Sequence, residues 1–565
     1  MNTTKAACIS VATLLAISAP VVRGRQGSEA TRRCEALQTT SIPATAIGLP
    51  TKGARLTSAR LVPATPHTKT APTPFNASGV TLARPEYCEV KGDIAPVDSA
   101  APPIRFQVNL PTEWNGKALH MGGGGYDGTV VTAIGAGPRA PDTAPYPITR
   151  GFATFGSDSG HEGNDASFAL NDEALVNFVY AQLKKTRDTA MAVIQARYDR
   201  TPTRTYFFGQ SEGGREGLTV TQRFPRDYDG VIVTAPAIHF TKVMMRFNDV
   251  ATALARPEGF LTPANISTFG NAVLAQCDGN DGVADGLVGN YLACKLDLTA
   301  LRCAAASAPK EGCFTDAQLA TLNAVYGPTT WKDASGTTIL AYPRYLVGGG
   351  EALPSGLALW ITGRQPMPRP QPPGNAMNQQ QLGIGIGPFY GNSAVRYLVA
   401  RDPALDTIDF DARPYADRVV AAVKLLDSAD PNLREFHMRG GKLIVLHNTA
   451  DLAVTPVATM EYYDALVKTL GADAVRRFAR LYIVPGGDHG GGNAPSKVDL
   501  LGMLDRWVVG GQAPDGTEIA GEYGPDLRVI RSKPLCAYPT YPRYVGTGDS
   551  NAAKSYRCAA AKSSS

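Results

Sequence analysis

Apolar residues recur along the chain in two patterns, one typical of buried strands and one typical of helices. Short apolar runs lie at 104–125, 151–157, 205–210, 230–236, 442–451 and 480–490, and they end in glycine or polar residues. Residues 172–198 instead carry apolar side chains at helical spacing after an acidic first turn. Strands that alternate with helices predict an α/β fold with a mostly parallel sheet covered on both faces.

A long central segment departs from this alternation. Residues 239–435 contain four cysteines, an Asp/Gly-rich loop and a proline-rich stretch at 364–374, but few apolar strand-like runs. We therefore predict that 239–435 form a lid domain inserted into an α/β core. The first part of that core spans 25–238 and the second part spans 436–565.

The N-terminus is typical of an exported protein. Lys5 precedes an apolar run from Ala6 to Val22, which small residues and Arg23 follow. This pattern predicts a signal peptide over 1–24, because the run is shorter than the roughly 20 apolar residues of a membrane span. A buried N-terminal helix is the alternative. We expect a secreted or periplasmic protein with no membrane span.

Charge and cysteine content narrow the class further. The 55 basic and 50 acidic residues leave a net charge of +5 without any Lys/Arg run, so we expect no nucleic-acid partner. Eight of the nine cysteines lie beyond the leader, an even number that suits disulfides in an oxidising compartment. Neighbour pairing, which sequence cannot prove, gives Cys34–Cys88, Cys277–Cys294, Cys303–Cys313 and Cys536–Cys558.

A candidate nucleophile stands between an aromatic strand and a helix. Gly209-Gln210-Ser211-Glu212-Gly213 matches G-x-S-x-G, in which glycines permit a strained turn that exposes the serine hydroxyl. The pattern alone is common, but the strand–turn–helix context favours a nucleophile at Ser211.

Such a serine needs a base, and the base needs a carboxylate, in the chain order Ser, Asp/Glu, His. His437, His447 and His489 follow Ser211 at long range, and His489 lies in a glycine loop after an apolar run. Asp451 ends the preceding apolar run and is the expected orienting acid. Its rival Asp488 is adjacent to His489, where the supporting hydrogen bond is difficult to form.

Catalysis of this kind also needs two backbone N–H groups to bind the oxyanion. One is expected from Glu212, the residue after the nucleophile. The other is expected from the loop Gly122–Gly125, with Gly125 preferred and Gly124 close behind. A phosphate-binding role for these glycines is disfavoured because no GxxxxGK[ST] motif follows.

Taken together, these motifs resemble the tannase/feruloyl esterase family over nearly the whole mature chain. The resemblance rests on the glycine loop 122–125, Ser157-Asp-Ser-Gly-His161, GQSEGGRE at 209–216, Asp451 with Tyr462-Tyr463, PGGDHGGG at 485–492 and Asp505-Arg-Trp507. It implies an α/β-hydrolase core with a large lid before the aspartate strand. It also implies Ser–His–Asp hydrolysis of aromatic-acid esters. The family usually has cysteines where this chain has Gln210 and Gly490, so a disulfide that links the triad is absent.

The resemblance also implies a metal site and a substrate pocket. The lid loop Cys277–Leu287 is similar to the family's structural calcium site. Its ligands would be Asp278, Asp281, Asp285 and the carbonyls of Val283 and Leu287. A solvated Asp/Gly turn is the alternative. For the substrate, His447 and Ala453 on either side of Asp451, with Trp360 from the lid, are the expected pocket residues. Arg364 and Arg369 are weaker candidates for a substrate carboxylate.

The leading hypothesis is a secreted serine esterase that acts on a small feruloyl, galloyl or terephthaloyl ester. One alternative is a non-catalytic, calcium-stabilised binding protein on a hydrolase scaffold, and another is a serine peptidase. Neither the alcohol group nor the oligomeric state follows from the sequence.

Overall fold

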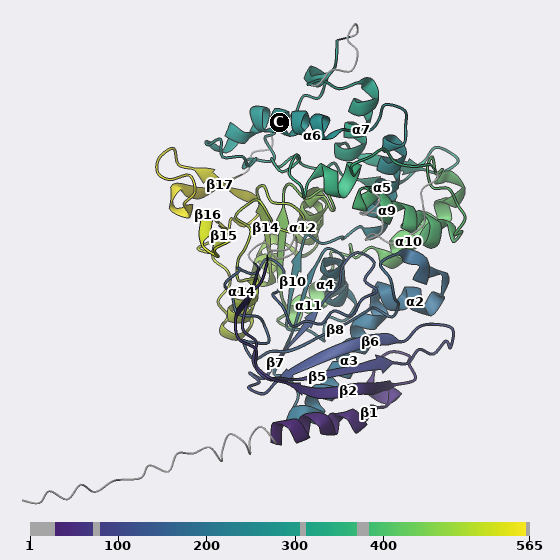
Figure 1. Ribbon diagram of the computed structural model, residues 1–565, viewed down its shortest axis with the longest axis vertical. Helices are drawn as coiled ribbons and strands as arrows, with labels where there is room; N and C mark the ends of the chain where they lie inside the picture. Colours follow the sequence, from purple (N-terminus) through teal and green to yellow (C-terminus); the bar gives the residue numbers. More distant parts are fainter. Residues whose placement is uncertain (1–28, 72–78, 305–311, 370–382, 561–565) are drawn as a thin grey trace, which may run out of the picture.

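A ten-stranded mixed sheet forms the centre of the computed structural model, which describes residues 29–71, 79–304, 312–369 and 383–560 (Figure 1). The strands in spatial order are β1 (Ser41–Ile42), β2 (Ala54–Val62), β5 (Tyr87–Ile94), β6 (Ile104–Pro111), β8 (Ala153–Ser157), β7 (Lys117–Met121), β9 (Arg204–Gln210), β10 (Gly230–Thr234), β13 (Lys442–Asn448) and β14 (Ala479–Val484).

The sheet has a parallel half and an antiparallel half. Strands β8, β7, β9, β10, β13 and β14 run parallel to their neighbours. Strands β1, β2, β5 and β6 are antiparallel, and β6 joins β8 antiparallel. The predicted α/β fold is confirmed, but the sheet is mixed. Residues 95–103 link β5 to β6 without a crossover helix, and so short a link suits antiparallel strands.

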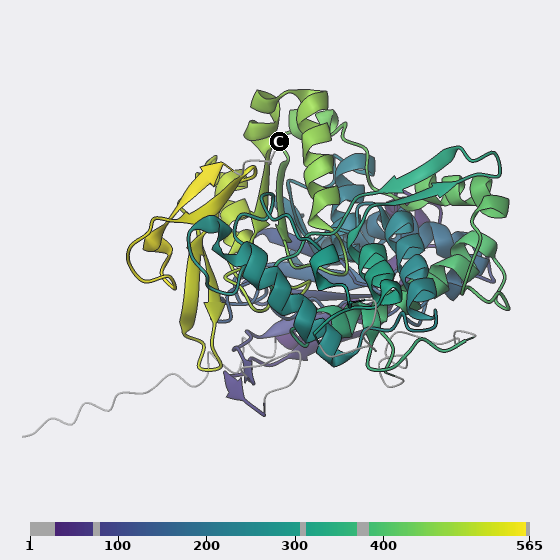
Figure 2. The ribbon, with the colours of Figure 1, turned by 90° about the horizontal axis from the view of Figure 1, so that it is seen from above.

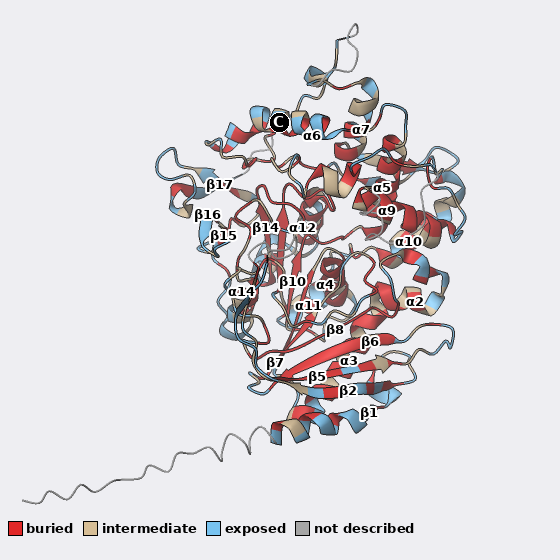
Figure 3. Ribbon diagram, viewed as in Figure 1, coloured by how far each residue is buried: buried red, intermediate tan, exposed pale blue. Residues whose placement is uncertain are grey.

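Helices cover both faces of the parallel half. On β10, Val231 and Val233 pack in one apolar cluster with Leu218 of α4 (Glu212–Arg223). Ile232 points to the other face and packs with Leu504 of α14 (Leu500–Gly510). Because successive side chains of a strand alternate between faces, an unbroken apolar run is buried on both sides (Figure 3).

The remaining core helices follow the predicted pattern. The helical region expected at 172–198 is continuous, formed by α2 (Asp172–Val176), a π-helical turn (Asn177–Ala181) and α3 (Gln182–Tyr198). Helices α12 (Pro456–Leu470) and α13 (Ala472–Phe478) lie between β13 and β14 in the chain.

The chain between β10 and β13 is mainly helical, and apart from α11 (Arg434–Met438) most of it lies beyond the ends of these strands (Figures 1 and 2). Its elements are α5 (Phe240–Leu254), α6 (Pro263–Cys277), α7 (Asp316–Tyr326), β11 (Thr329–Lys332), β12 (Thr338–Tyr342), α9 (Ile386–Ser393), α10 (Ala416–Leu426) and α11 (Arg434–Met438). One apolar cluster joins all of these elements except α11 to Tyr126 and Phe178 of the sheet region. The lid boundaries at 239 and 435 stay a prediction.

Four disulfides and two C-terminal hairpins complete the chain. The bonds join Cys34–Cys88, Cys277–Cys294, Cys303–Cys313 and Cys536–Cys558, as neighbour pairing predicts. The hairpins are β15 (Ile519–Tyr523) with β16 (Val529–Pro534) and β17 (Thr540–Tyr544) with β18 (Tyr556–Ala560). In the described ranges, no helix is long and apolar enough to cross a membrane. The predicted signal peptide lies outside the described residues.

Candidate active site

Ser211 stands at a strained turn between β9 and α4. Its φ of 62° and ψ of −118° lie in a region that non-glycine residues rarely adopt. The flanking glycines allow this turn, because a Cβ at Gly209 would lie 2.1 Å from the carbonyl oxygen of Gly213. A Cβ at Gly213 would lie 2.7 Å from the carbonyl oxygen of Gly123. The local geometry is that of a nucleophile elbow.

Asp451 and His489 are in direct contact although 38 residues separate them. His489 Nδ1 lies 2.7 Å from Asp451 Oδ2. Asp451 follows β13 and His489 follows β14, and these neighbouring parallel strands bring both loops to one edge of the sheet. The second carboxylate oxygen, Oδ1, accepts the backbone N–H groups of Ala453 and Val454 at 2.9 Å each. These backbone hydrogen bonds therefore fix the orientation of the Asp451 carboxylate.

The surroundings of Asp451 favour its ionised form. Burial raises the pKa of its carboxyl group, but the charge of His489 and hydrogen bonds from His447 and His489 outweigh burial and lower the pKa below its usual range. Asp488, the rejected rival, turns to its own loop, where it accepts the backbone N–H of Gly492 at 2.9 Å. The geometry thus pairs His489 with Asp451.

The residues expected to bind an oxyanion, Gly124, Gly125 and Glu212, all line one cavity with Ser211. Within the described residues, Gly125 and Glu212 donate no backbone hydrogen bond, whereas the Gly124 N–H interacts with the Asp127 carboxyl group. A buried side chain fixes the loop that carries the glycines, since the Gly123 N–H donates to Glu216 Oε2 at 3.0 Å. The Glu212 side chain turns away into a buried ion pair with Arg215. The backbone N–H groups of Gly125 and Glu212 therefore remain available to a ligand.

Buried carboxyl groups lie behind this loop. Burial, with the charge of Glu212, raises the pKa of Asp127 to about 8. Burial likewise raises the pKa of Glu216 well above its usual value, with Asp127 and Glu212 adding to the effect. Ser159 donates to Asp127 Oδ2 at 2.7 Å, whereas Asp127 Oδ1 has no partner in the described structure. A protonated Asp127 at neutral pH fits this environment.

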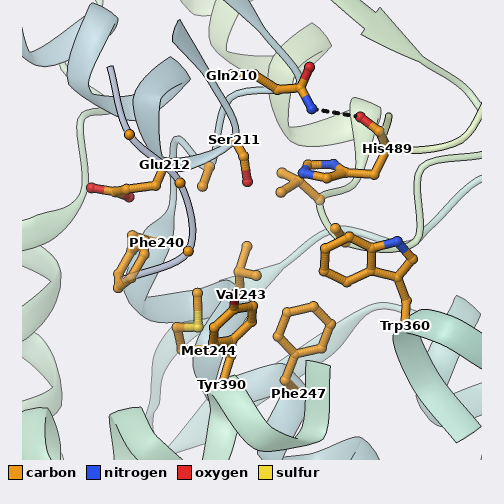
Figure 4. Close-up of a pocket in the computed structure, with 16 residues that line it drawn as sticks. Gln210, Ser211, Glu212, Phe240, Val243, Met244, Phe247, Trp360, Tyr390 and His489 are labelled. Carbon is orange, nitrogen blue, oxygen red and sulfur yellow. Dashed lines mark hydrogen bonds between the residues drawn. The ribbon is translucent and has the colours of Figure 1, made fainter. Parts of the chain in front are cut away.

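Ser211 and His489 face one cavity of about 270 Å³ (Figure 4). Five other residues that the sequence singled out line it too: Gly124, Gly125, Glu212, Ala453 and Trp360. The Trp360 indole meets the His489 ring edge-on, with ring centroids 4.9 Å apart. The cavity therefore combines a candidate nucleophile, base and oxyanion donors with an aromatic wall.

His447 lies elsewhere than expected. Its side chain is fully buried and does not line the cavity. Its Nε2 lies 3.2 Å from Asp451 Oδ2 and 3.1 Å from the Val454 carbonyl oxygen, while Nδ1 lies 2.8 Å from Thr459 Oγ1. The expected pocket-lining role thus finds no support, because β13 points this ring behind Asp451. Arg364 and Arg369 also lie outside the cavity lining, and Arg369 pairs with Asp409.

Residues that the sequence analysis did not single out build most of the apolar wall. They lie on α5 at positions 240, 243, 244 and 247, a spacing that marks one face of a helix. This helical periodicity was the sequence signal that could have identified these wall residues. Tyr390 of α9 adds a phenol beside Gly125. Arg139 was also missed, and its guanidinium donates to the His489 carbonyl oxygen at 2.8 Å.

Two aspartates of the acidic loop in the lid, Asp278 and Asp281, are buried, and the loop contacts a lysine. Asp278 accepts the backbone N–H groups of residues 285, 286 and 287. Asp281 Oδ2 and Asp285 Oδ1 are buried without a hydrogen-bond partner in the described structure. Lys533 Nζ of β16 lies 2.8 Å from Asp285 Oδ2 and 4.0 Å from Asp281 Oδ2.

These oxygen donors are of the type that calcium prefers, and the unpartnered oxygens suit a cation. In the described residues, however, no group of three or more acidic, His or Cys side chains is arranged to hold a metal. The fit to calcium is therefore partial.

Comparisons with known proteins agree with the fold. The arrangement of sheet, serine turn and histidine loop defines an α/β-hydrolase class of protein. Residues 88–559 match the family model described as tannase and feruloyl esterase. The chain belongs to this family and is a carboxylic ester hydrolase.

Individual relatives align with this protein over most of its length. An uncharacterised esterase of Agrobacterium fabrum is 36% identical over 550 residues, covering 93% of each protein. The mono(2-hydroxyethyl) terephthalate hydrolase of Piscinibacter sakaiensis is 31% identical, covering 86% of this chain and 87% of that enzyme. Feruloyl esterase B from Aspergillus oryzae has a similar fold, with a TM-score of 0.75 and 24% identity over 94% of this chain and 100% of that one.

Proposed function

We propose that this protein is an exported serine esterase that hydrolyses esters of aromatic carboxylic acids through an acyl-enzyme on Ser211. The observation that carries the proposal is the 2.7 Å contact between His489 Nδ1 and Asp451 Oδ2, beside a cavity that Ser211 also lines. With Nδ1 held by the carboxylate, Nε2 is the ring nitrogen left for the serine hydroxyl.

The reaction proceeds in two halves. Ser211 Oγ attacks the ester carbonyl carbon as its proton passes to His489 Nε2, and Gly125 and Glu212 N–H groups bind the oxyanion, with Gly124 beside them. Collapse of the intermediate breaks the carbon–oxygen ester bond, and His489 returns the proton to the leaving alcohol. Water then attacks the acyl-enzyme by the same route and releases the acid. Asp451 stays ionised throughout and stabilises the imidazolium.

Two observations support an aromatic acid. The cavity walls include Trp360 and two phenylalanines of α5, which suit a flat ring. The relatives bear names that specify feruloyl and terephthaloyl esters. Export is supported by the N-terminal sequence pattern and by four disulfides, which persist in oxidising compartments.

We further propose a structural calcium ion in the lid loop. Asp278, Asp281 and Asp285, with the carbonyls of Val283 and Leu287, would hold it, and its role would be to stabilise this loop. The unpartnered oxygens of Asp281 and Asp285 support the proposal.

A fluorophosphonate probe tests the catalytic role directly. We expect stoichiometric labelling of Ser211 and loss of activity in Ser211→Ala by about 10⁴-fold or more, with an unchanged melting temperature. Folded protein that resists the probe and hydrolyses no ester would instead support a non-catalytic binding protein. Faster cleavage of an amide than of the matched ester would support a peptidase.

A further inference from the structure

The far wall of the cavity is built from hydrocarbon. Phe240, Val243, Met244 and Phe247 of α5 line it, and Figure 4 shows them below Ser211, with Trp360 of the lid beside His489. Four of these side chains come from one face of one helix, which packs tightly against α9. A ligand group that enters this end of the cavity therefore exchanges water for apolar surface.

The polar groups of the cavity are mostly engaged. Glu212 is held by Arg215, and the amide of Gln210 contacts the His489 carbonyl oxygen. Ser211 and His489 belong to the reaction itself. The second carboxylate oxygen of Glu212, Oε2, has no partner in the described structure. The Tyr390 hydroxyl stands beside Gly125 and can donate or accept one hydrogen bond. It can orient a neutral hydroxyl or ether oxygen.

No lysine or arginine is among the residues that line the cavity in the described structure. Of the nearby buried guanidinium groups, Arg215 is held by Glu212 and by backbone carbonyls. Arg139 does not line the cavity; its Nη2 donates to the His489 carbonyl, while its Nε and Nη1 have no partner in the described structure. Residues 370–382, outside the described part, contain no lysine, arginine or histidine in their sequence. The ionised Asp451 adds negative charge close to the reacting centre.

We infer that the cavity selects esters whose bound acid part is neutral, and that it discriminates against an acid that carries a second, ionised carboxylate. This inference rests on the proposed function and narrows its substrate class to uncharged aromatic acyl groups. A carboxylate against the α5 wall would lose its water without gaining a cation or donors, and burial of an unpaired charge is unfavourable. This preference would differ from that of the relative named mono(2-hydroxyethyl) terephthalate hydrolase, because the ester in that name carries a free carboxylate (the mono-acid below).

A matched pair of substrates tests the inference on the wild-type enzyme. Bis(2-hydroxyethyl) terephthalate and mono(2-hydroxyethyl) terephthalate contain the same ester and ring, and differ in the neutral or ionised group at the far end. We expect kcat/KM for the diester to be higher by at least about a hundredfold at pH 7.5, after correction for its two equivalent ester bonds and for the alkaline hydrolysis rates. A ratio below about threefold would overturn the inference.

The two proposals fail in different ways. If the diester is hydrolysed and Ser211 is labelled, but the mono-acid is hydrolysed equally well, the esterase assignment stands and the neutral-substrate inference is wrong. If neither ester is hydrolysed and the fluorophosphonate leaves Ser211 unlabelled, the proposed function is wrong and the inference falls with it.

A charge introduced into the wall provides an independent test. Met244→Lys places an ammonium group on a chain of similar length, and Met244→Gln is the neutral polar control. We expect the lysine variant to raise the mono-acid to diester ratio of kcat/KM by at least about tenfold, and the glutamine variant to leave that ratio unchanged. An equal change in both variants would contradict the electrostatic explanation. If the lysine variant does not fold, as its melting curve would show, the wild-type pair decides the question.

Discussion

Gln210, the residue before the candidate nucleophile Ser211, donates its side-chain amide to the backbone carbonyl oxygen of His489 at 3.1 Å, across 279 positions of sequence (Figure 4). The hydroxyl of Thr234 donates to Gln210 Oε1 at 3.3 Å, which fixes which end of the amide faces His489. Arg139 donates to the same His489 carbonyl. Two donors from separate segments thus hold the loop that carries the candidate base.

We predict that this contact positions His489. Gln210→Glu keeps the side-chain shape but replaces the donor with a carboxylate that repels the carbonyl oxygen. We expect kcat to fall about tenfold with KM nearly unchanged, because misplacement of a base affects the chemical step more than binding. Gln210→Met, which removes both polar contacts without adding charge, is the control and should lose less. Wild-type kcat in Gln210→Glu would contradict a positioning role.

A second prediction concerns His447. Both neighbours of its Nε2, the Asp451 carboxylate and the Val454 carbonyl, are acceptors, so Nε2 carries the proton and Nδ1 accepts from Thr459. Burial lowers the pKa of His447, which agrees with a neutral ring, although the hydrogen bond to Asp451 opposes it. His447 therefore donates to the carboxylate that orients His489.

Removal of this donor should loosen the carboxylate. We expect His447→Leu to lower kcat by about tenfold to a hundredfold with little change in KM, and to shift the acidic limb of the pH–kcat profile. His447→Gln, which retains a donor near the Nε2 position, should recover part of the loss. Equal rates in the two variants would indicate that His447 only fills space.

A third prediction uses the raised pKa of Asp127, which is about 8. In the unfolded chain the pKa of Asp127 is near 4. At pH values between about 4 and 8, Asp127 is therefore ionised in the unfolded chain and protonated in the folded protein. The stability of the wild type therefore falls as pH rises through this window, by at most about 1.4 kcal/mol per pH unit. Asp127→Asn removes this dependence.

We thus expect the difference in melting temperature, Asp127→Asn minus wild type, to be larger at pH 8 than at pH 5. Parallel thermal unfolding curves at the two pH values measure the effect. A difference between the proteins that is the same at pH 5 and pH 8 would rule out a protonated Asp127 in the folded state.

The chemistry of the elbow explains why much of the site could be predicted from the sequence. A strained serine turn requires glycines at fixed positions, and the Asp and His loops must follow successive sheet strands. Both requirements leave local marks, so Ser211, Asp451 and His489 could be chosen, and the Asp451–His489 contact matches that choice. Neighbour pairing of cysteines succeeded because each bridge closes a short loop, with separations from 10 to 54 residues.

Other features depend on contacts between distant segments and leave no such marks. His447 ends a strand that is buried on both faces, so its spacing from Asp451 could not reveal whether the ring points to the cavity or behind the carboxylate. The antiparallel strands β1, β2 and β5 were missed as well, because short strands with mixed apolar and polar positions carry a weak periodic signal. Lys533 lies about 250 residues beyond the acidic loop that it contacts.

The last prediction tests the acidic loop and its lysine together. An ion that binds the folded lid but not the unfolded chain raises the melting temperature, so metal-stripped wild type should gain about 2–5 °C on addition of calcium. Lys533 places one positive charge beside Asp285 and Asp281, which compensates part of their charge. Lys533→Met removes that compensation, and the calcium-dependent gain should then exceed that of the wild type. Asp281→Asn, which removes a ligand oxygen and a charge, is the matched control and should reduce the gain. If calcium changes the melting temperature of neither the wild type nor Lys533→Met, the loop is a plain Asp/Gly turn held by the lysine.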